Sequence, residues 1–175
     1  MANNLQRALR NANRSTINKV LAKARTATSK AVREVYNIKA GELNKVIKLR
    51  RASNQRLQGV ISVKTRKTSL IKFAARPRKI NKRLGVTVKV KRTGARKLVM
   101  EKYGGFIGTA KGTTAKQIFI RQEDSRLPID KKFTLSVSQM VERAGETELN
   151  KTIQKDLPRI QKSELNEYIR RELRR

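Results

Sequence analysis

Three carboxylates in the segment QEDSRLPID are the first residues in this sequence that could do chemistry. Glu123, Asp124 and Asp130 offer oxygen ligands of the kind that Mg²⁺ prefers, and a bound Mg²⁺ could serve a nuclease. Basic side chains surround this cluster, namely Arg121, Arg126, Lys131 and Lys132. Because no spacing in the cluster is diagnostic of a metal site, we interpret it as a turn with local ion pairs.

Other types of catalytic residue are scarce or absent. The chain has no His and no Cys, which removes the commonest general base, disulfides, thiolate metal ligands and Cys nucleophiles. The stretch GGFIGTAKG lacks the GxxxxGK[ST] order of a phosphate-binding loop, and we predict a hairpin there. A Ser nucleophile would need a lysine base, and nothing in the sequence marks one. We therefore expect no enzyme, no cofactor and no metal.

Basic residues are the strongest signal. The 175 residues include 44 Lys and Arg against 13 Asp and Glu, a formal net charge of +31. Residues 1–100 hold 28 basic residues and only two acids, Glu34 and Glu42, whereas residues 101–175 hold 16 basic and 11 acidic residues. Self-repulsion on this scale opposes a compact isolated chain, so we expect an anionic partner, either nucleic acid or an acidic protein surface.

We predict that basic residues in three segments, 50–51, 76–83 and 89–92, contact this partner. The densest run, 76–83, lies where no acid occurs between Glu42 and Glu101. The sequence shows neither a base-stacking aromatic pair nor zinc-finger spacing, so any contact with DNA would be to phosphates. The predicted contact residues are Arg50, Arg51, Arg76, Arg78, Lys79, Lys82, Arg83, Lys89, Lys91 and Arg92.

Helices are predicted at both ends of the chain. Apolar residues from Leu5 to Val35 recur at spacings of three and four without Gly or Pro, which predicts one helix over residues 3–36, roughly 50 Å long. Its basic face is open to two interpretations, a solvated face or a contact with DNA or an acidic partner. Residues from Asp130 onward also read as helical, with Gly145 as a weak point. Pro158 should kink this helix or begin a second one.

The sequence between the two predicted helical regions indicates short strands. The clearest is GVTVKVKR, residues 85–92, where Val and Thr or Lys alternate. The other predicted strands are 46–51, 56–65, 70–74, KLVMEKY, FIGTA and KQIFIRQ, the last two forming a hairpin. Between Val35 and the first strand, residues 40–45 could form one short helical turn.

These elements predict an α+β fold. We expect a long N-terminal helix, a small antiparallel sheet or barrel-like core of about five to seven strands, and a C-terminal helix or kinked helix pair. The organisation would be one domain over residues 1–175, with a helical arm at 1–36, a β core at 46–122 and a helical arm at 133–175. No apolar run approaches the roughly 20 residues needed to cross a bilayer, and the first residues lack the apolar middle of a signal peptide. We therefore expect no membrane contact and a protein made in a host cytoplasm.

Several segments in a fixed order resemble the prophage minor tail protein Z family. The match is collinear over residues 1–175 and strongest from 46 to 140; the order and spacing of the motifs carry it. Ala74 stands where the family often has Gly, and the acids and Pro158 in the C-terminal helix also depart from its pattern. The matching segments are KLRRAS, VISV, LIKFAARPRK, GVTVKV, GGFIGTAKG, IFIRQ, RLPI and LSVSQM.

The resemblance implies a structural role in a phage virion. Such proteins are similar to tail-completion proteins, which lie at the head-proximal end of a long tail and make it competent to join the head. It implies a hexameric ring around the DNA passage, with the tail terminator and the head-completion (connector) proteins as neighbours and non-specific phosphate contacts to the end of the packaged DNA. It implies no catalytic residues. The alternatives are a stand-alone basic nucleic-acid-binding protein, ribosomal or nucleoid-like, and an enzyme acting on nucleic acid.

Overall fold

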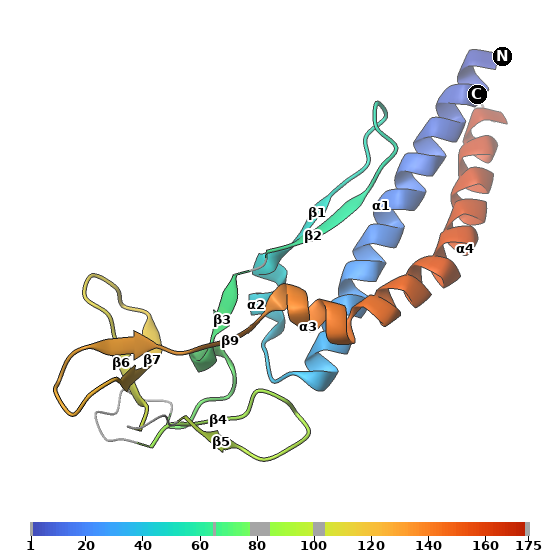
Figure 1. The fold of residues 1–175 in the computed structure, drawn as a ribbon. Coiled ribbons are helices and arrows are strands. Elements are labelled where there is room, and N and C mark those ends of the chain that lie inside the picture. The colour runs from blue at the N-terminus through green and yellow to red at the C-terminus, as the bar shows by residue number, and fades with distance from the viewer. Residues whose placement is uncertain (1, 65, 78–84, 100–103, 174–175) are drawn as a thin grey trace. The chain divides into compact units, whose positions relative to one another are not determined.

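In sequence, long helices at the two ends of the chain flank a region of short strands (Figure 1). The structure, a computed structural model, describes residues 2–64, 66–77, 85–99 and 104–173. The helices are α1 (Ala2–Val35), α2 (Ala40–Val46), α3 (Val137–Ala144) and α4 (Glu146–Leu173). The strands are β1 (Ile47–Arg50), β2 (Val60–Val63), β3 (Lys67–Ser69), β4 (Thr87–Val88), β5 (Lys97–Leu98), β6 (Phe106–Thr109), β7 (Lys116–Arg121), β8 (Ile129–Lys131) and β9 (Phe133–Ser136). The predicted α+β class, with its long N-terminal helix, small antiparallel sheets and C-terminal helix, is confirmed.

The chain divides into two compact units. Unit 1 combines Met1–Ala31, Asn44–Val63 and Val141–Arg175, and unit 2 combines Val32–Leu43 with Lys64–Met140. Strands β1 and β2, which the sequence placed with the β core, therefore belong to the helical unit. The prediction of a single domain over residues 1–175 stays a prediction.

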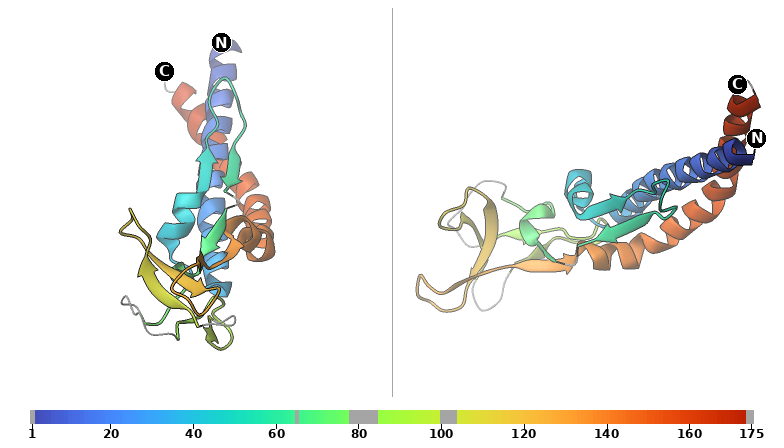
Figure 2. Two further views of the ribbon diagram at one scale, coloured as in Figure 1. Left: turned by 60° about the vertical axis from the view of Figure 1, so that its left-hand side comes forward. Right: turned by 90° about the horizontal axis from the view of Figure 1, so that it is seen from above.

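In unit 1, α1 lies beside α4, and the β1–β2 hairpin runs along α1 (Figures 1 and 2). The buried face of α1 is built from small and branched residues at helical spacing, including Ala8, Ala12, Val20 and Ala24. Short side chains let neighbouring backbones approach closely, which explains why the Ala-rich face is the packed face. The predicted helix over residues 3–36 is thus confirmed.

The β1–β2 hairpin is held on α1 by one polar clamp and one close approach. The Asn18 side chain donates to the carbonyl of Ala52 at 3.1 Å and accepts from the Ala52 amide at 2.9 Å. At Gly59, a Cβ atom would collide with the side chains of Ile17 and Leu21. A larger residue here would require the side chains of Ile17 and Leu21 to move, so glycine lets the hairpin lie close to the helix without that rearrangement.

The start of α3 has a local cause. The Ser136 hydroxyl accepts a hydrogen bond from the Gln139 amide at 3.2 Å, and the Gln139 side chain accepts one from the Ser136 amide at 3.0 Å. This reciprocal capping box satisfies two backbone donors that the first helical turn leaves free. The C-terminal helical region is interrupted at Gly145, while α4 continues through Pro158 and changes direction along its length (Figure 1).

The described residues of unit 2 form three small antiparallel sheets. Strands β6, β7 and β8 form one sheet, with Ile107 opposite Ile118 and Ile120 opposite Asp130. Strand β3 pairs with β9, and β4 pairs with β5. The largest fully buried side chains of the unit include Phe73, Ile107, Ile118 and Ile120, which form its core. The predicted hairpin of FIGTA with KQIFIRQ is confirmed by the β6–β7 pair.

Two predictions for this region were wrong in detail. Residues 70–74 form a 3₁₀ turn at Leu70–Lys72 instead of a strand, and Ala74 follows with a positive φ of 36°. The burial that the apolar pattern indicated is nevertheless present, because the Phe73 side chain is fully buried. Residues 130–136 were expected to be helical but contribute to β8 and β9, because β8 pairs with β7 and β9 pairs with the distant strand β3.

The strand predicted at 85–92 is shorter than expected. Only Thr87–Val88 pairs as a strand, although the predicted alternation holds, with Val86 and Val88 buried. Within KLVMEKY, Lys97–Leu98 is a strand, and residues 100–103 lie outside the described residues.

Candidate functional site

The predicted contact residues fall in both units. Arg50 ends β1, Arg51 follows it, and both side chains are exposed on unit 1. In unit 2, Arg76 and Arg92 are exposed, Lys91 is exposed and Lys89 is half-buried. The remaining predicted residues, Arg78, Lys79, Lys82 and Arg83, lie outside the described residues.

Backbone hydrogen bonds fix the positions of Arg76 and Arg92 within unit 2. Arg76 and Thr87 exchange two hydrogen bonds of 2.8 and 2.9 Å between their amides and carbonyls, so Arg76 lies at the edge of β4. The Arg92 amide donates to the carbonyl of Val35, and the Asn37 amide donates to that of Val90, both at 2.8 Å. These bonds tie residues 90–92 to the end of α1 within the same unit. The backbone from which Lys91 and Arg92 project is therefore held in place.

The six described contact residues have no acidic partner within the described chain. The ion pair nearest to them in sequence joins Lys72 and Glu42, and it does not involve any of the predicted contact residues. Their charges are therefore available to a partner. That such a partner binds here remains a prediction.

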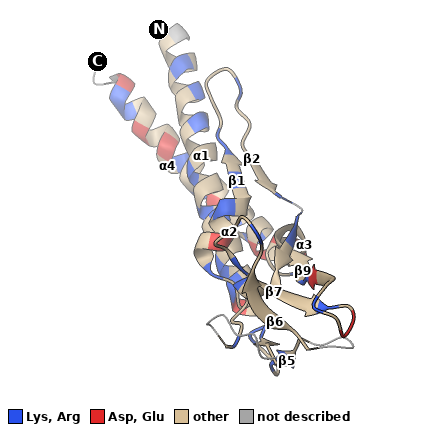
Figure 3. Cartoon of the chain, turned by 90° about the vertical axis from the view of Figure 1, so that its left-hand side faces the viewer, with Lys and Arg blue, Asp and Glu red and all other residues tan. Residues whose placement is uncertain are grey.

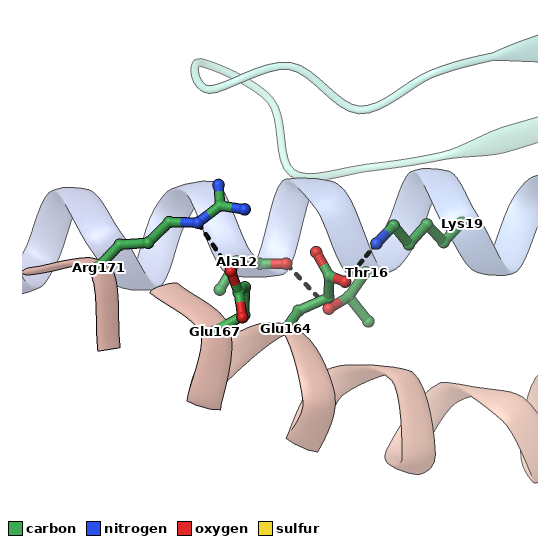
Figure 4. A network of polar contacts seen from close by, with 6 residues as sticks. All are labelled: Ala12, Thr16, Lys19, Glu164, Glu167 and Arg171. Carbon is green, nitrogen blue, oxygen red and sulfur yellow. Dashed lines mark hydrogen bonds and ion pairs between the residues drawn. The ribbon is translucent and has the colours of Figure 1, made fainter. Parts of the chain in front are cut away.

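Acids of α4 face cations of α1 in unit 1, an arrangement that sequence reasoning missed. Lys19 forms an ion pair with Glu164 (Figure 4), and the Lys23 ammonium lies 3.6 Å from a carboxylate oxygen of Asp156. A signal was present in the sequence. Lys19 and Lys23 are four residues apart and Asp156 and Glu164 eight apart, so each pair occupies one helix face.

Glu164 is the best-shielded acid of this contact. Its side chain is only 10% exposed, whereas that of Lys19 is 58% exposed. Burial raises the pKa of Glu164, but hydrogen bonds from Lys19 and Ser15 and the positive charges of Lys19 and Arg171 outweigh it, so the net pKa lies below the ordinary value. Glu164 is therefore charged at neutral pH and part of the α1–α4 interface.

The charge asymmetry of the sequence thus has a partial structural explanation. Along α1 the charged residues are Lys and Arg apart from Glu34, whereas α4 carries acidic and basic residues along its length (Figure 3). The acids gathered in the last third of the chain neutralise part of the N-terminal helix. Within the described residues, no comparable acidic element faces the exposed cations of unit 2.

A groove between α1 and α4 remains cationic even so. It has a volume of about 990 Å³ and a floor of small side chains, including Ala22, Thr26 and Ala27. Five basic residues line it against two acids, namely Lys23, Lys30, Lys151, Lys155 and Arg159 against Glu148 and Asp156. This groove is compatible with the second of the two interpretations of the basic face of α1, a contact with DNA or an acidic partner, and neither interpretation is tested by it.

The acidic turn at 122–130 does not form the expected local ion pairs. Asp130 accepts a hydrogen bond from the Gln122 side chain. Glu123 and Asp124 are exposed, and neither forms an ion pair with a described residue. Among the described residues, no group of three His, Cys, Asp or Glu side chains is arranged to hold a metal ion. No described helix is long and apolar enough to cross a membrane.

Comparison with known proteins gives one match. The sequence model of the family described as prophage minor tail protein Z matches residues 2–175. A search of curated proteins and a search of solved structures each found no match. Because the matched region is essentially the whole chain, the protein belongs to the prophage minor tail protein Z family and is a structural protein of a phage tail.

Proposed function

We propose that this tail protein lies at the head-proximal end of the tail, forms a hexameric ring around the DNA passage and makes the tail competent to join the head. Its neighbours would be the tail terminator and the head-completion proteins of the virion. The family membership supports a tail role, and the ring and its position are our inference from that role. No catalytic step is part of the proposal.

The observation that carries the proposal is the unmatched positive charge of unit 2. Its exposed contact residues Arg76, Lys91 and Arg92 form no ion pair with a described acid. The chain as a whole carries a net charge of +31, so acids are too few to neutralise its cations. Like charges of this number repel one another in a compact chain and between neighbouring subunits. An assembled collar resolves the conflict, because acidic surfaces of other virion proteins, or the phosphates of the DNA end, would cancel the charge.

Charge reversal tests the contact residues. We expect Arg76→Glu, Lys89→Glu and Arg92→Glu together to abolish infectivity when the variant replaces the wild-type protein in the prophage. The matched control is Lys64→Glu, Lys111→Glu and Lys116→Glu, which changes the charge of the same unit equally at exposed positions. Equal infectivity of the two variants would count against the proposed contact surface.

Imaging tests the location. Electron cryomicroscopy of the intact tail should place a ring of this protein where the tail meets the head. Density for the protein along the tube or at the distal tip would contradict the proposal.

A stand-alone nucleic-acid-binding protein is the second candidate, and the net charge of +31 favours it. A protein of that kind would coat DNA as a monomer, with affinity that falls steeply as salt concentration rises. Titration of DNA into the purified protein at increasing ionic strength, with its mass measured in parallel, separates the two candidates. Ring-sized assemblies, or assembly only together with tails, support the tail-ring function.

A further inference from the structure

A groove in unit 2 combines an apolar interior with a basic rim. Its volume is about 480 Å³, within the range of sites that hold small ligands or a few side chains. Tyr36, Val88 and Ile120, all at most 3% exposed, lie at its base. Lys91 and Lys97 are exposed at its edge, and no acid lines it.

One wall of this groove is an unfinished sheet edge. Strand β5, Lys97–Leu98, pairs with β4 on one side, and no other described strand pairs with it. Leu98 also lines the groove and is 47% exposed. An apolar side chain and an open strand edge beside a basic rim favour a ligand that is both apolar and acidic.

The β7–β8 turn of the same unit has the opposite character. Residues 122–128 carry Glu123 and Asp124, both exposed and without an ion pair to a described residue, with Arg126 as the one cation among them. Leu127 in this turn is 64% exposed, more than any other large apolar residue that the structure describes. Carboxylates left without an ion pair are unexpected in a chain with 44 basic residues.

The β7–β8 turn lies apart from strands β4 and β5 within unit 2 (Figure 1). The β7–β8 turn projects from the unit in the two views in which it is seen most clearly (Figures 1 and 2), away from β4 and β5. Ser125 donates a hydrogen bond to the carbonyl of Leu127, which holds the turn in shape. A turn that projects from its own unit is accessible to a neighbouring copy.

We propose that the β7–β8 turn of one copy docks in the groove of the next, with Leu127 in the apolar interior and Glu123 and Asp124 against Lys91 and Lys97. Two different patches meet in this contact, so it is heterologous and closes into a ring if the rotation between copies allows. The inference rests on the proposed ring and names the contact that builds it. It also explains how copies with a large like charge adhere, because the contact brings acids to lysines locally.

Cross-linking tests the contact in assembled tails. The chain has no Cys, so only the engineered cysteines of this protein can react with the cross-linker. We expect Leu98→Cys with Leu127→Cys in one chain to give a covalent ladder of oligomers when tails are treated with a short bismaleimide. Each single variant should give no dimer, because a heterologous contact never brings two copies of the same residue together. Dimers from Leu127→Cys alone would overturn the proposal.

Charge exchange tests the pairing. We expect Glu123→Lys with Asp124→Lys to lower the yield of infectious tails about tenfold, and Lys91→Glu with Lys97→Glu to do the same, since a tenfold change in an equilibrium corresponds to about 1.4 kcal/mol. The four substitutions combined should restore most of the yield. Lys111→Glu with Lys116→Glu is the control for added negative charge on exposed sites of the unit.

The outcomes separate this inference from the ring itself. Rings in the tail without cross-links or rescue would overturn the docking contact and leave the ring in place. If the yield of infectious tails falls when the groove lysines are reversed but not when the acids of the turn are reversed, docking between copies is overturned. The ligand of the groove would then be an acidic segment of another tail protein. A single isolated copy per tail would remove the ring and the inference together.

Discussion

Replacing Glu164 with Gln tests how the acids of α4 stabilise the cationic helix α1 in unit 1. Gln keeps the size of the side chain but removes the charge that pairs with Lys19 (Figure 4). A hydrogen bond to a charged group contributes about 1.5–3 kcal/mol. Lys19 is more than half exposed, so solvent screens part of this. We therefore expect Glu164→Gln to lower the free energy of unfolding by about 1 kcal/mol at pH 7.

The pH dependence of this loss has a definite sign. The net pKa of Glu164 in the folded protein is lowered, chiefly because the hydrogen bonds and charge of Lys19 outweigh the effect of burial. A carboxyl with a lowered folded pKa stabilises the fold above its unfolded pKa, and this contribution is lost as the pH falls through the folded pKa. The difference between wild type and Glu164→Gln should therefore be complete at neutral pH and disappear in acid, below the ordinary range of a glutamate.

Urea unfolding followed by circular dichroism, repeated across this pH range, measures the effect. The control is Glu142→Gln, which removes the same charge from an exposed residue that forms no ion pair with a described residue. We expect the control to change the unfolding free energy by less than about 0.5 kcal/mol. An equal loss in both variants, or a difference that grows as the pH falls, would refute the reasoning.

Three further substitutions test the packing, each by urea unfolding. Gly59→Ala should destabilise unit 1 by about 1–3 kcal/mol, because its Cβ would collide with the buried Leu21 side chain on α1; a neutral result would mean that Leu21 and Ile17 repack without cost and would refute the close-approach argument. Phe73→Ala should destabilise unit 2 by about 3–5 kcal/mol, because the ring is fully buried, and an exposed-site cost below about 0.5 kcal/mol would contradict that burial. Pro158→Ala should stabilise unit 1 by about 1–3 kcal/mol, because Pro is far less favourable than Ala inside a helix; a loss of stability would show that α4 needs its bend.

Local patterns in the sequence predicted the helices and several strands correctly. The stripe of apolar residues over 3–36 predicts α1, since helical periodicity depends only on residues three and four apart. The hairpin of β6 with β7 follows from two β-rich runs around the turn-like AKGTTA. The sequence SVSQ likewise contains the capping box that starts α3.

Pairing between distant residues explains the predictions that were wrong. Residues 130–136 were predicted to be helical, but β8 pairs with β7 and β9 pairs with β3, which is remote in sequence. The stretch 70–74 supplies a buried Phe73 through a turn, because the Leu70 amide donates to the Lys132 carbonyl and the β3–β9 ladder ends there. A single sequence does not state which remote partner a strand will find.

The candidate sites divide in the same way. Composition alone indicated an excess of exposed cations and a need for an anionic partner, and it pointed to residues such as Arg76 and Lys91. It did not indicate that Glu123 and Asp124 would be left without ion pairs, nor that Lys91 and Lys97 would border an apolar groove. Both facts depend on side chains that the fold brings together from separate strands.

The sequence by itself therefore determined the charge, the lack of His and Cys chemistry, the helices at the two ends and the family to which the chain belongs. These properties are sums over residues or patterns among near neighbours. The tertiary structure alone decided which acids neutralise α1, which strands pair and which surfaces of unit 2 stay open. The physical reason is that ion pairs, strand ladders and grooves are contacts in space, and folding determines which distant residues meet.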